Sequence, residues 1–311
     1  MFRNTYLTYN NEEIRDGYFS QLQRQMAIYS IARRYLFSYY HSTIKEVTIT
    51  PLDSFKTKAQ MIKRLSEYNK IYAIDENKNE IVFSKIIEIQ APTLISILWQ
   101  GLKHLFRREK ILIKITIPYR IIEKNPDLYS PACRKLLSNF NSQCDTTSVV
   151  VHIRRGVLES HITAGETSPR SIGIEYFISV LKQIMKTNSF SERDTLTILT
   201  DAPAKNIYFK PSFEQENLHR EFNYLKSDKG ILVKGYEFNE FALCFPGKVN
   251  IIRGGDAHEA VSKMRFADHF IMSRSSMSYV GALLNISGAI YYPPNFWHKP
   301  QKKWIHGAKF I

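Results

Sequence analysis

The feature that most constrains this fold is a short apolar run, residues 149–153, that stops at Arg154, Arg155 and Gly156. Its β-branched residues favour a strand, and a short continuous apolar run is typical of a strand buried on both faces of a parallel sheet. Ligands of open α/β sheets bind at the carboxyl ends of strands, where a guanidinium can grip phosphate in a bidentate manner. A surface arginine pair after an edge strand is the alternative interpretation.

The rest of the second half alternates strands with helices. We expect strands at 194–201, 267–272 and 289–292 and helices at 174–186, 256–266 and 273–284. This alternation predicts a doubly wound parallel sheet. Its strands should bring Arg154, Asp201 and Ser273–Ser276 to one edge. Ser275 and Ser276 open a helix, so they can offer hydroxyls beside free backbone N–H groups, although such serines are most often simple caps.

The first half opens like a βαβ unit. A strand at 5–9 leads through a loop containing Gly17 into a helix over 18–36. Such a loop can present backbone N–H groups to a ligand, but it fits a plain strand-to-helix turn equally well. A polar stretch at 139–147 marks a domain boundary. We therefore expect an α/β chain of two domains, 1–143 and 144–311.

The bulk composition is ordinary for a globular protein except for a net charge of +14. This charge predicts a polyanionic partner, either nucleotide phosphates, nucleic acid or an anionic membrane face. No RNA-binding or zinc motif accompanies it, which makes nucleic acid the weaker choice. Three scattered cysteines and the lack of a signal peptide or an apolar membrane span predict a cytoplasmic protein.

Residues 92–108 predict an amphipathic helix that contains Trp99 and ends near Lys103, Arg107 and Arg108. Basic amphipathic helices with tryptophan can lie in a membrane interface. An ordinary helix that faces the core explains the same pattern and is the interpretation we favour. The alternative is a peripheral contact with the anionic inner leaflet.

Four segments, in order, carry a resemblance to a known family. They are Asp16-Gly-Tyr-Phe-Ser-Gln-Leu-Gln-Arg24, His152-Ile-Arg-Arg155, Leu199-Thr-Asp-Ala-Pro203 and Met264-Arg-Phe-Ala-Asp-His-Phe-Ile-Met-Ser-Arg-Ser-Ser276. They resemble motifs of the GDP-fucose-dependent fucosyltransferases, the α1,2, α1,6 and protein O-fucosyltransferase superfamily. The resemblance implies a GT-B-like fold, in which two Rossmann-type domains with parallel sheets face a cleft. Residues 1–143 would form the acceptor side and 144–311 the nucleotide-sugar side.

The resemblance also implies roles for single residues. Arg154 resembles the arginine that grips the β-phosphate of GDP, and Arg155 would neighbour the donor sugar. Asp268 resembles the acid that reads the guanine edge. The remaining expected contacts of the nucleotide sugar are His152, Asp201, Ser275, Ser276, Gly17 and Gln21. Glu166 resembles a catalytic glutamate, and Glu159 and His161 compete with it for the role of base.

We therefore expect an inverting, metal-independent glycosyltransferase that moves fucose from GDP-fucose to a hydroxyl of a surface-glycan acceptor, which could be lipid-linked. It would need no cofactor besides the donor, because arginine and a helix dipole can neutralise a diphosphate and no Asp-x-Asp motif is present. Ala202 and Met277 depart from the family pattern and leave the donor sugar open. The alternatives are a related enzyme with another nucleotide sugar and a non-enzymatic RNA or membrane binder.

Overall fold

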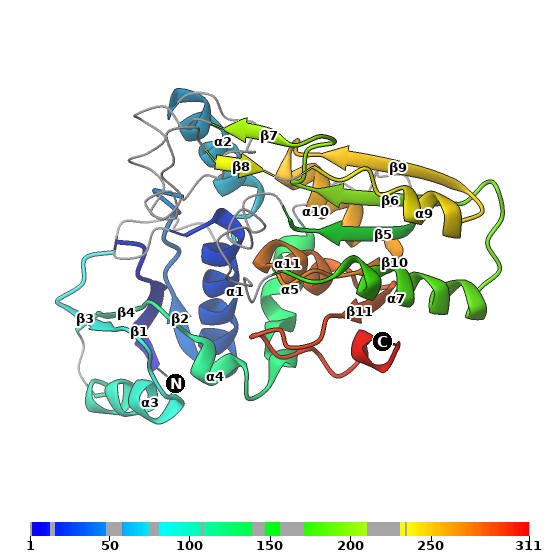
Figure 1. Ribbon diagram of the computed structural model, residues 1–311. Coiled ribbons are helices and arrows are strands. Elements are labelled where there is room, and N and C mark those ends of the chain that lie inside the picture. The colour runs from blue at the N-terminus through cyan, green and yellow to red at the C-terminus, as the bar shows by residue number, and fades with distance from the viewer. Residues whose placement is uncertain are drawn as a thin grey trace. The chain divides into compact units, whose positions relative to one another are not determined.

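The structure of the chain is a computed structural model that describes residues 2–12, 16–47, 58–74, 81–106, 109–138, 147–155, 171–209, 231–233 and 235–310. These residues form two compact units, one built from residues 2–47 and 59–138 and the other from Lys58 and the described residues from 147 onward (Figure 1). The predicted boundary between residues 143 and 144 lies outside the described residues. The limits of the two domains therefore stay a prediction.

The first unit contains a four-stranded sheet in the order β2-β1-β4-β3, in which every neighbouring pair is parallel. Its elements are β1 (Phe2–Tyr9), α1 (Tyr18–Arg34), β2 (Phe37–Tyr39), α2 (Lys58–Ile71), β3 (Lys85–Ile89), α3 (Leu94–Lys103), β4 (Ile111–Ile115), α4 (Tyr119–Ile122), the 3-10 helix η1 (Pro126–Tyr129) and α5 (Ser130–Leu137). Alternate residues of β1 and β4, such as Leu7 and Ile113, share one buried cluster with Ile28 of α1 and Ile97 of α3. One face of the sheet is therefore packed against α1 and α3.

The second unit contains a six-stranded sheet, which is parallel throughout, in the order β12-β11-β10-β5-β6-β9. Its elements are β5 (Thr147–Ile153), α7 (Ile174–Thr187), β6 (Thr195–Thr200), β7 (Ile207–Phe209), β8 (Ile231–Val233), α9 (Asn239–Cys244), β9 (Lys248–Arg253), α10 (Ala257–Arg265), β10 (Ala267–Ile271), α11 (Ser276–Leu284), β11 (Ala289–Tyr292), β12 (Ile305–His306) and the 3-10 helix η4 (Gly307–Phe310). Strands β7 and β8 form a separate antiparallel pair. The predicted α/β class with parallel sheets is confirmed.

The strand order of this sheet reverses beside β5. After β5, the chain adds β6 and β9 on one side, then crosses over and adds β10, β11 and β12 on the other side (Figure 1). Helices α7 and α9 pack on one face, because Val149, Val151 and Ile153 share a buried cluster with Phe177 and Phe241. Helices α10 and α11 contact each other, and α10 packs against β5 and β10. No helix in the described ranges is long and apolar enough to cross a membrane.

Candidate functional site

Three strands that bear polar residues end at one edge of the six-stranded sheet. Ile153 of β5 pairs with Thr200 of β6, and Val151 pairs with Ile271 of β10, all in parallel register. The residues that follow these strands, Arg154, Asp201 and Ser273, therefore share the carboxyl edge, as the sequence predicts. The reversal of strand order places β5 and β10 at the point where open α/β sheets usually bind ligands.

His152 joins the end of β5 to the start of α11. Its Nδ1 atom lies 2.5 Å from Oγ of Ser278 and 3.2 Å from Oγ of Ser273. Ser278 Oγ also accepts a hydrogen bond from the backbone N–H of Ser273, at 3.2 Å. All three side chains are buried. Burial, followed by the positive charge of Arg154, lowers the pKa of His152 to about 3, so the imidazole is neutral at physiological pH. Such a neutral imidazole can hold the connection between β10 and α11 in place through Ser273 and Ser278 without adding charge.

Arg154 is half-buried at the carboxyl edge. Its guanidinium lies close enough to His152 to affect the pKa of that imidazole. Within the described part of the chain, it forms neither a hydrogen bond nor an ion pair. Arg154 is thus a cation at the expected edge whose hydrogen-bond donors are available to a bound anion.

Arg155 is held inside the second unit by hydrogen bonds, and its expected place beside the donor sugar stays a prediction. It is 7% exposed, and its guanidinium donates to the hydroxyl of Tyr236 at 3.1 Å and to the carbonyl oxygen of Ile172 at 3.0 Å. The guanidinium carbon also lies 4.7 Å from the centre of the Tyr236 ring. The reason is the alternation of side chains along a strand. Arg155 continues the face of Val151 and Ile153, which packs on α7, and Arg154 continues the face of His152.

Asp201 braces the loop that carries the two arginines. Its Oδ1 atom accepts a hydrogen bond from the backbone N–H of Arg155 at 2.6 Å. This contact links the end of β6 to the end of β5. The expected contact of Asp201 with a nucleotide sugar stays a prediction, and the structure gives this residue a positioning role.

The two serines at the start of α11 differ from each other. Ser275 is buried and caps the helix, because its Oγ accepts a hydrogen bond from the backbone N–H of Met277 at 3.2 Å. Ser276 is the first helical residue and is half-buried. The first N–H groups of a helix lack intrahelical partners and attract anions. Ser276 therefore stands where a phosphate oxygen could be bound, and Ser275 shapes the turn.

Asp268 does not lie at this edge, and its expected contact with the guanine base stays a prediction. It is the second residue of β10, and its neighbour Ala267 pairs with Thr147, the first residue of β5. The side chain of Asp268 is exposed at the amino edge of the sheet. At about 3.3 Å per residue, the length of β10 separates Asp268 from Met272 by roughly 13 Å.

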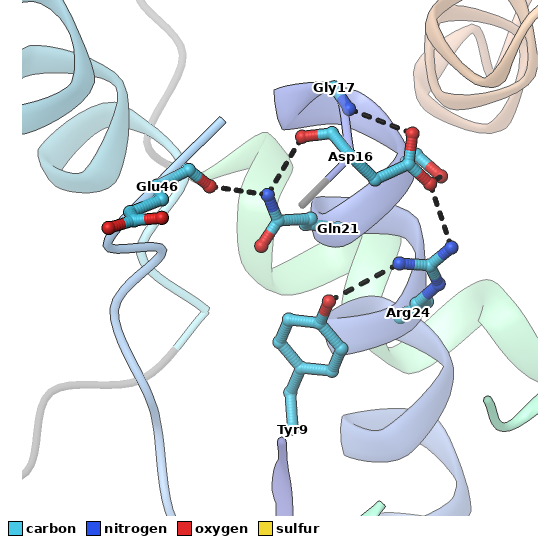
Figure 2. Close-up of polar contacts among 7 residues, drawn as sticks. Tyr9, Asp16, Gly17, Gln21, Arg24 and Glu46 are labelled. Carbon is cyan, nitrogen blue, oxygen red and sulfur yellow. Dashed lines mark hydrogen bonds and ion pairs between the residues drawn. The ribbon is translucent and has the colours of Figure 1, made fainter. Parts of the chain in front are cut away.

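The loop before α1 contains Gly17 and Gln21, which we expect at a cleft. The amide nitrogen of Gln21 donates to the carbonyl oxygens of Asp16 at 2.9 Å and of Glu46 at 2.6 Å (Figure 2). Gln21 is buried and its amide holds the loop before α1 together, and its expected position at the border of the cleft stays a prediction. Gly17 is the N-cap of α1, and a Cβ atom added there would meet no atom within 4 Å. The described residues therefore leave room beside Gly17.

Beside this loop, Arg24 forms a partly buried polar network. Its guanidinium donates to Oδ2 of Asp16 at 2.8 Å and to the hydroxyl of Tyr9 at 3.3 Å (Figure 2). Burial alone would lower the pKa of Arg24, but the neighbouring Tyr119, Tyr9 and Asp16 raise it overall. Burial in turn raises the pKa of Tyr119 to about 12. Arg24 therefore remains charged and fixes the side chain of Asp16 at the start of α1.

Two further arginines at the carboxyl edge of the second unit were missed by the sequence reasoning. Arg253 ends β9 and donates to the carbonyl oxygen of Ala202 at 2.9 Å. Arg274 precedes α11 and donates to the carbonyl oxygens of Pro294 at 2.8 Å and Ser171 at 3.2 Å. A signal for Arg253 was present, because it ends an apolar run and precedes two glycines, just as Arg154 and Arg155 precede Gly156.

The edge therefore carries more positive than negative charge. Arg154, Arg155, Arg253 and Arg274 lie there with Asp201 and with the N-terminus of α11. Guanidinium groups and a helix N-terminus are suited to binding a phosphate or diphosphate. Glu166, Glu159 and His161 lie outside the described residues, so the identity of a base stays a prediction. In the part of the chain that the structure describes, no group of three or more metal-ligating side chains comes together.

Comparisons with known proteins give no family. No family model matches the chain, and no curated protein matches it. Among solved structures, it is similar to E. coli heptosyltransferase WaaC with ADP-2-deoxy-2-fluoro heptose, at 9% identity over 97% of this chain and 92% of that chain, with a TM-score of 0.35. It is also similar to E. coli heptosyltransferase WaaC with ADP, at 9% identity over the same shares of both chains, with a TM-score of 0.38. Likeness at this level assigns neither family nor function.

Proposed function

We propose that this chain is a glycosyltransferase whose nucleotide-sugar donor binds at the carboxyl edge of the second unit. The observation that carries the proposal is the reversal of strand order between β5 and β10, with Arg154 after one strand and the start of α11 after the other. Open α/β sheets bind nucleotides at such a reversal. The pair thus offers a cation and a helix dipole to one diphosphate.

Sugar transfer requires charge stabilisation on the leaving diphosphate. When the bond between the anomeric carbon and the diphosphate oxygen breaks, that oxygen gains negative charge. Preorganised donors aimed at such an oxygen lower the barrier, and one of them typically contributes about 10²–10³ in rate. Arg154 suits this role because its donors are not used by the described residues, whereas Arg155 serves a structural one.

The sequence motifs favour GDP-fucose as the donor and the hydroxyl of a surface glycan as the acceptor. The position of Asp268 at the opposite edge weakens the argument for guanine, since that acid was expected to read the base. Another nucleotide sugar is therefore the alternative donor. We also propose that the transfer inverts the configuration at the anomeric carbon. A carboxylate, with Glu166 as our candidate, takes the proton of the acceptor hydroxyl while the oxygen attacks the anomeric carbon and the diphosphate departs.

Residues 1–143, which include Gly17, stay our candidate for the acceptor side. Metal independence and a cytoplasmic location also stay predictions. Metal independence can be tested with purified protein, because transfer should then persist in excess EDTA.

A ligand panel tests the proposal directly. We would measure thermal shifts of the wild type and of Arg154→Ala with GDP, UDP, CMP and ADP sugars and with the free nucleotides. One donor class should stabilise the wild type, and Arg154→Ala should lose most of that stabilisation. Arg193→Ala is the matched control, because Arg193 is an exposed arginine in the turn before β6, at the amino edge. No stabilisation by any nucleotide, together with salt-dependent RNA binding, would instead support the non-enzymatic alternative.

A further inference from the structure

Helix α3 of the first unit has two apolar sides. Ile97 and Gly101 are buried, and Leu94, Leu98 and Leu105 pack against the core cluster of the sheet. Another side of the helix carries a second apolar set, which we call the α3 stripe, formed by Ile95 (80% exposed), Trp99 (57%), Leu102 (47%) and Phe106 (95%). The first three recur at helical spacing, and Phe106 lies in the turn that follows. The core-facing interpretation of residues 92–108 is thus correct for one side only.

The orientation of α3 is fixed, so the α3 stripe cannot turn into the core. A Cβ atom at Gly101 would lie 2.7 Å from Cε1 of Phe37 and 2.9 Å from Cδ1 of Phe2. These two rings are stacked with their centres 4.5 Å apart. Thr93 and Ser96 form a reciprocal capping box at the start of the helix. Close packing at Gly101 and the capped start hold the helix in place, with the side chains of the stripe exposed.

Positive charge accompanies the stripe. Helix α3 contains no acidic residue, and the ammonium group of Lys103 lies 5.4 Å from the centre of the Trp99 ring. In the sequence, residues 103–110 include Lys103, Arg107, Arg108 and Lys110 against one acid, Glu109. A tryptophan beside a lysine suits the boundary between lipid headgroups and acyl chains, where the ring is partly buried and the cation stays at the headgroups.

We propose that α3 docks the first unit on the surface of a bilayer that contains anionic lipids, lying in the plane of the interface with the α3 stripe inserted. The positive charge of residues 103–110 favours an anionic bilayer over a second copy of the chain as the partner of the stripe. A second copy bound through the same stripe would bring two Lys103 side chains and their basic neighbours into one small apolar patch, where like charges repel. An anionic bilayer offers both an apolar boundary and the opposite charge. This inference does not depend on the proposed sugar transfer.

Vesicle binding of the full chain tests the inference. We would measure co-sedimentation with vesicles of phosphatidylcholine alone and of phosphatidylcholine mixed with phosphatidylglycerol, at about 0.1 M and about 0.5 M salt. The protein should bind the anionic vesicles more tightly, and the higher salt should weaken that binding. Fluorescence of the wild type should shift to shorter wavelength on binding, and Trp99→Phe should remove most of the shift.

Substitutions separate the contributions of the stripe and the charge. Trp99→Ser combined with Phe106→Ser should lower the affinity for anionic vesicles by about tenfold or more, because both side chains lose their buried apolar area. Lys103→Glu should lower it by about tenfold or more, since each cation near an anionic surface contributes about fivefold. Leu243→Ser is the control, because Leu243 is 87% exposed on α9 of the second unit, and it should leave the affinity unchanged.

Folding is not a confounding factor, because all the substituted side chains are exposed and the variants should keep the melting temperature of the wild type. Three results would overturn the inference. The first is binding that ignores both anionic lipid and salt, or no binding at all. The second is an equal loss in Leu243→Ser. The third is a dimer that Trp99→Ser dissociates, which would assign the stripe to a second copy of the chain.

Discussion

Nδ1 of His152 lies 2.5 Å from Oγ of Ser278, although 125 residues separate them in the chain. The contact joins the end of strand β5, just before the two arginines, to the first turn of helix α11. Because both partners are buried, the hydrogen bond replaces interactions with water that neither group can make. The two sides of the proposed diphosphate site are therefore fixed relative to each other before any ligand arrives.

Burial of a neutral His152 predicts a characteristic pH dependence. The pKa of His152 in the folded protein is about 3, against 6.5 for a histidine in an unfolded chain. Above pH 6.5 neither state binds the proton, so the stability contribution is fully present. As the pH falls below 6.5 the unfolded state gains a proton that the folded state refuses, and the free energy of unfolding should drop by about 1.4 kcal/mol per pH unit.

Urea denaturation between pH 7.5 and 5 measures this slope. His152→Gln should be less stable than the wild type at pH 7.5, because its longer amide cannot reproduce the ring, but it should lose less stability as the pH falls. The difference between the two slopes isolates His152 from the carboxylates, which titrate in both proteins. Parallel slopes would contradict the assignment of a buried neutral imidazole.

Replacing Arg154 should lower the rate of sugar transfer, whereas replacing Arg155 should lower the stability of the fold. Arg154→Ala should keep the stability of the wild type within about 0.5 kcal/mol, because the side chain is half-buried and bonds to no described residue. It should lower the rate of transfer by about 10²–10³. Arg155→Ala should lower the free energy of unfolding by about 2–4 kcal/mol, because Tyr236 and Ile172 lose a charged donor.

Chemical denaturation and turnover, measured on both variants, check this contrast. Arg155→Lys is an informative companion, since lysine keeps the charge but cannot bond Tyr236 and Ile172 together in the same planar arrangement. It should recover only part of the lost stability. If Arg154→Ala proves to be the unstable variant and Arg155→Ala the inactive one, the assignment of the two side chains is reversed.

The regular elements of the second unit were predictable because buried parallel strands leave continuous apolar runs in the sequence. The runs before Arg154 and before Asp201 became β5 and β6, and the serine-opened helix became α11, beginning at Ser276 with Ser275 as its cap. The shared edge also followed, since parallel strands ending in polar residues must end together. These conclusions depend only on local patterns and on sheet geometry.

The orientation of single side chains was harder to predict. Strand alternation implies that Arg154 and Arg155 point to opposite faces, but only the packing on α7 identifies which face is filled. The second position of Asp268 in its strand already pointed to the amino edge, and the family resemblance outweighed that signal. The amide of Gln21 donates a hydrogen bond to the carbonyl oxygen of Glu46, which lies 25 residues away in the sequence. No local sequence pattern could therefore reveal that this amide is used inside the first unit.

The two serines of α11 offer a matched pair for separating capping from binding. Ser275→Ala removes the acceptor for the backbone N–H of Met277 and should lower stability by about 1 kcal/mol. Ser276→Ala should change stability by less than about 0.5 kcal/mol, because Ser276 is a half-buried first helical residue. Ser276→Ala should instead weaken nucleotide binding, which titration calorimetry with the donor identified by the panel can measure. Equal melting temperatures for both variants would contradict this division.

Arg24 should stabilise the first unit more than any exposed arginine of α1. Replacing it leaves Asp16 without its ion pair at 2.8 Å, and breaking a buried or partly buried pair typically costs about 3 kcal/mol. Since Asp16 is about a third exposed, we expect about 2 kcal/mol for Arg24→Met. Arg34→Met is the control, because Arg34 is exposed at the end of the same helix, and it should change stability by less than about 0.5 kcal/mol.

Hydrogen exchange resolved along the chain is the appropriate measurement, because it reports on the amides of each unit separately. Arg24→Met should speed exchange of amides in β1, α1 and β4, which share the core cluster of the first unit, and leave those of β5 and β6 unchanged. Asp16→Asn should give a smaller effect, since Arg24 keeps its hydrogen bond to Tyr9. If Arg24→Met and Arg34→Met speed exchange equally, the network around Arg24 does not stabilise the first unit.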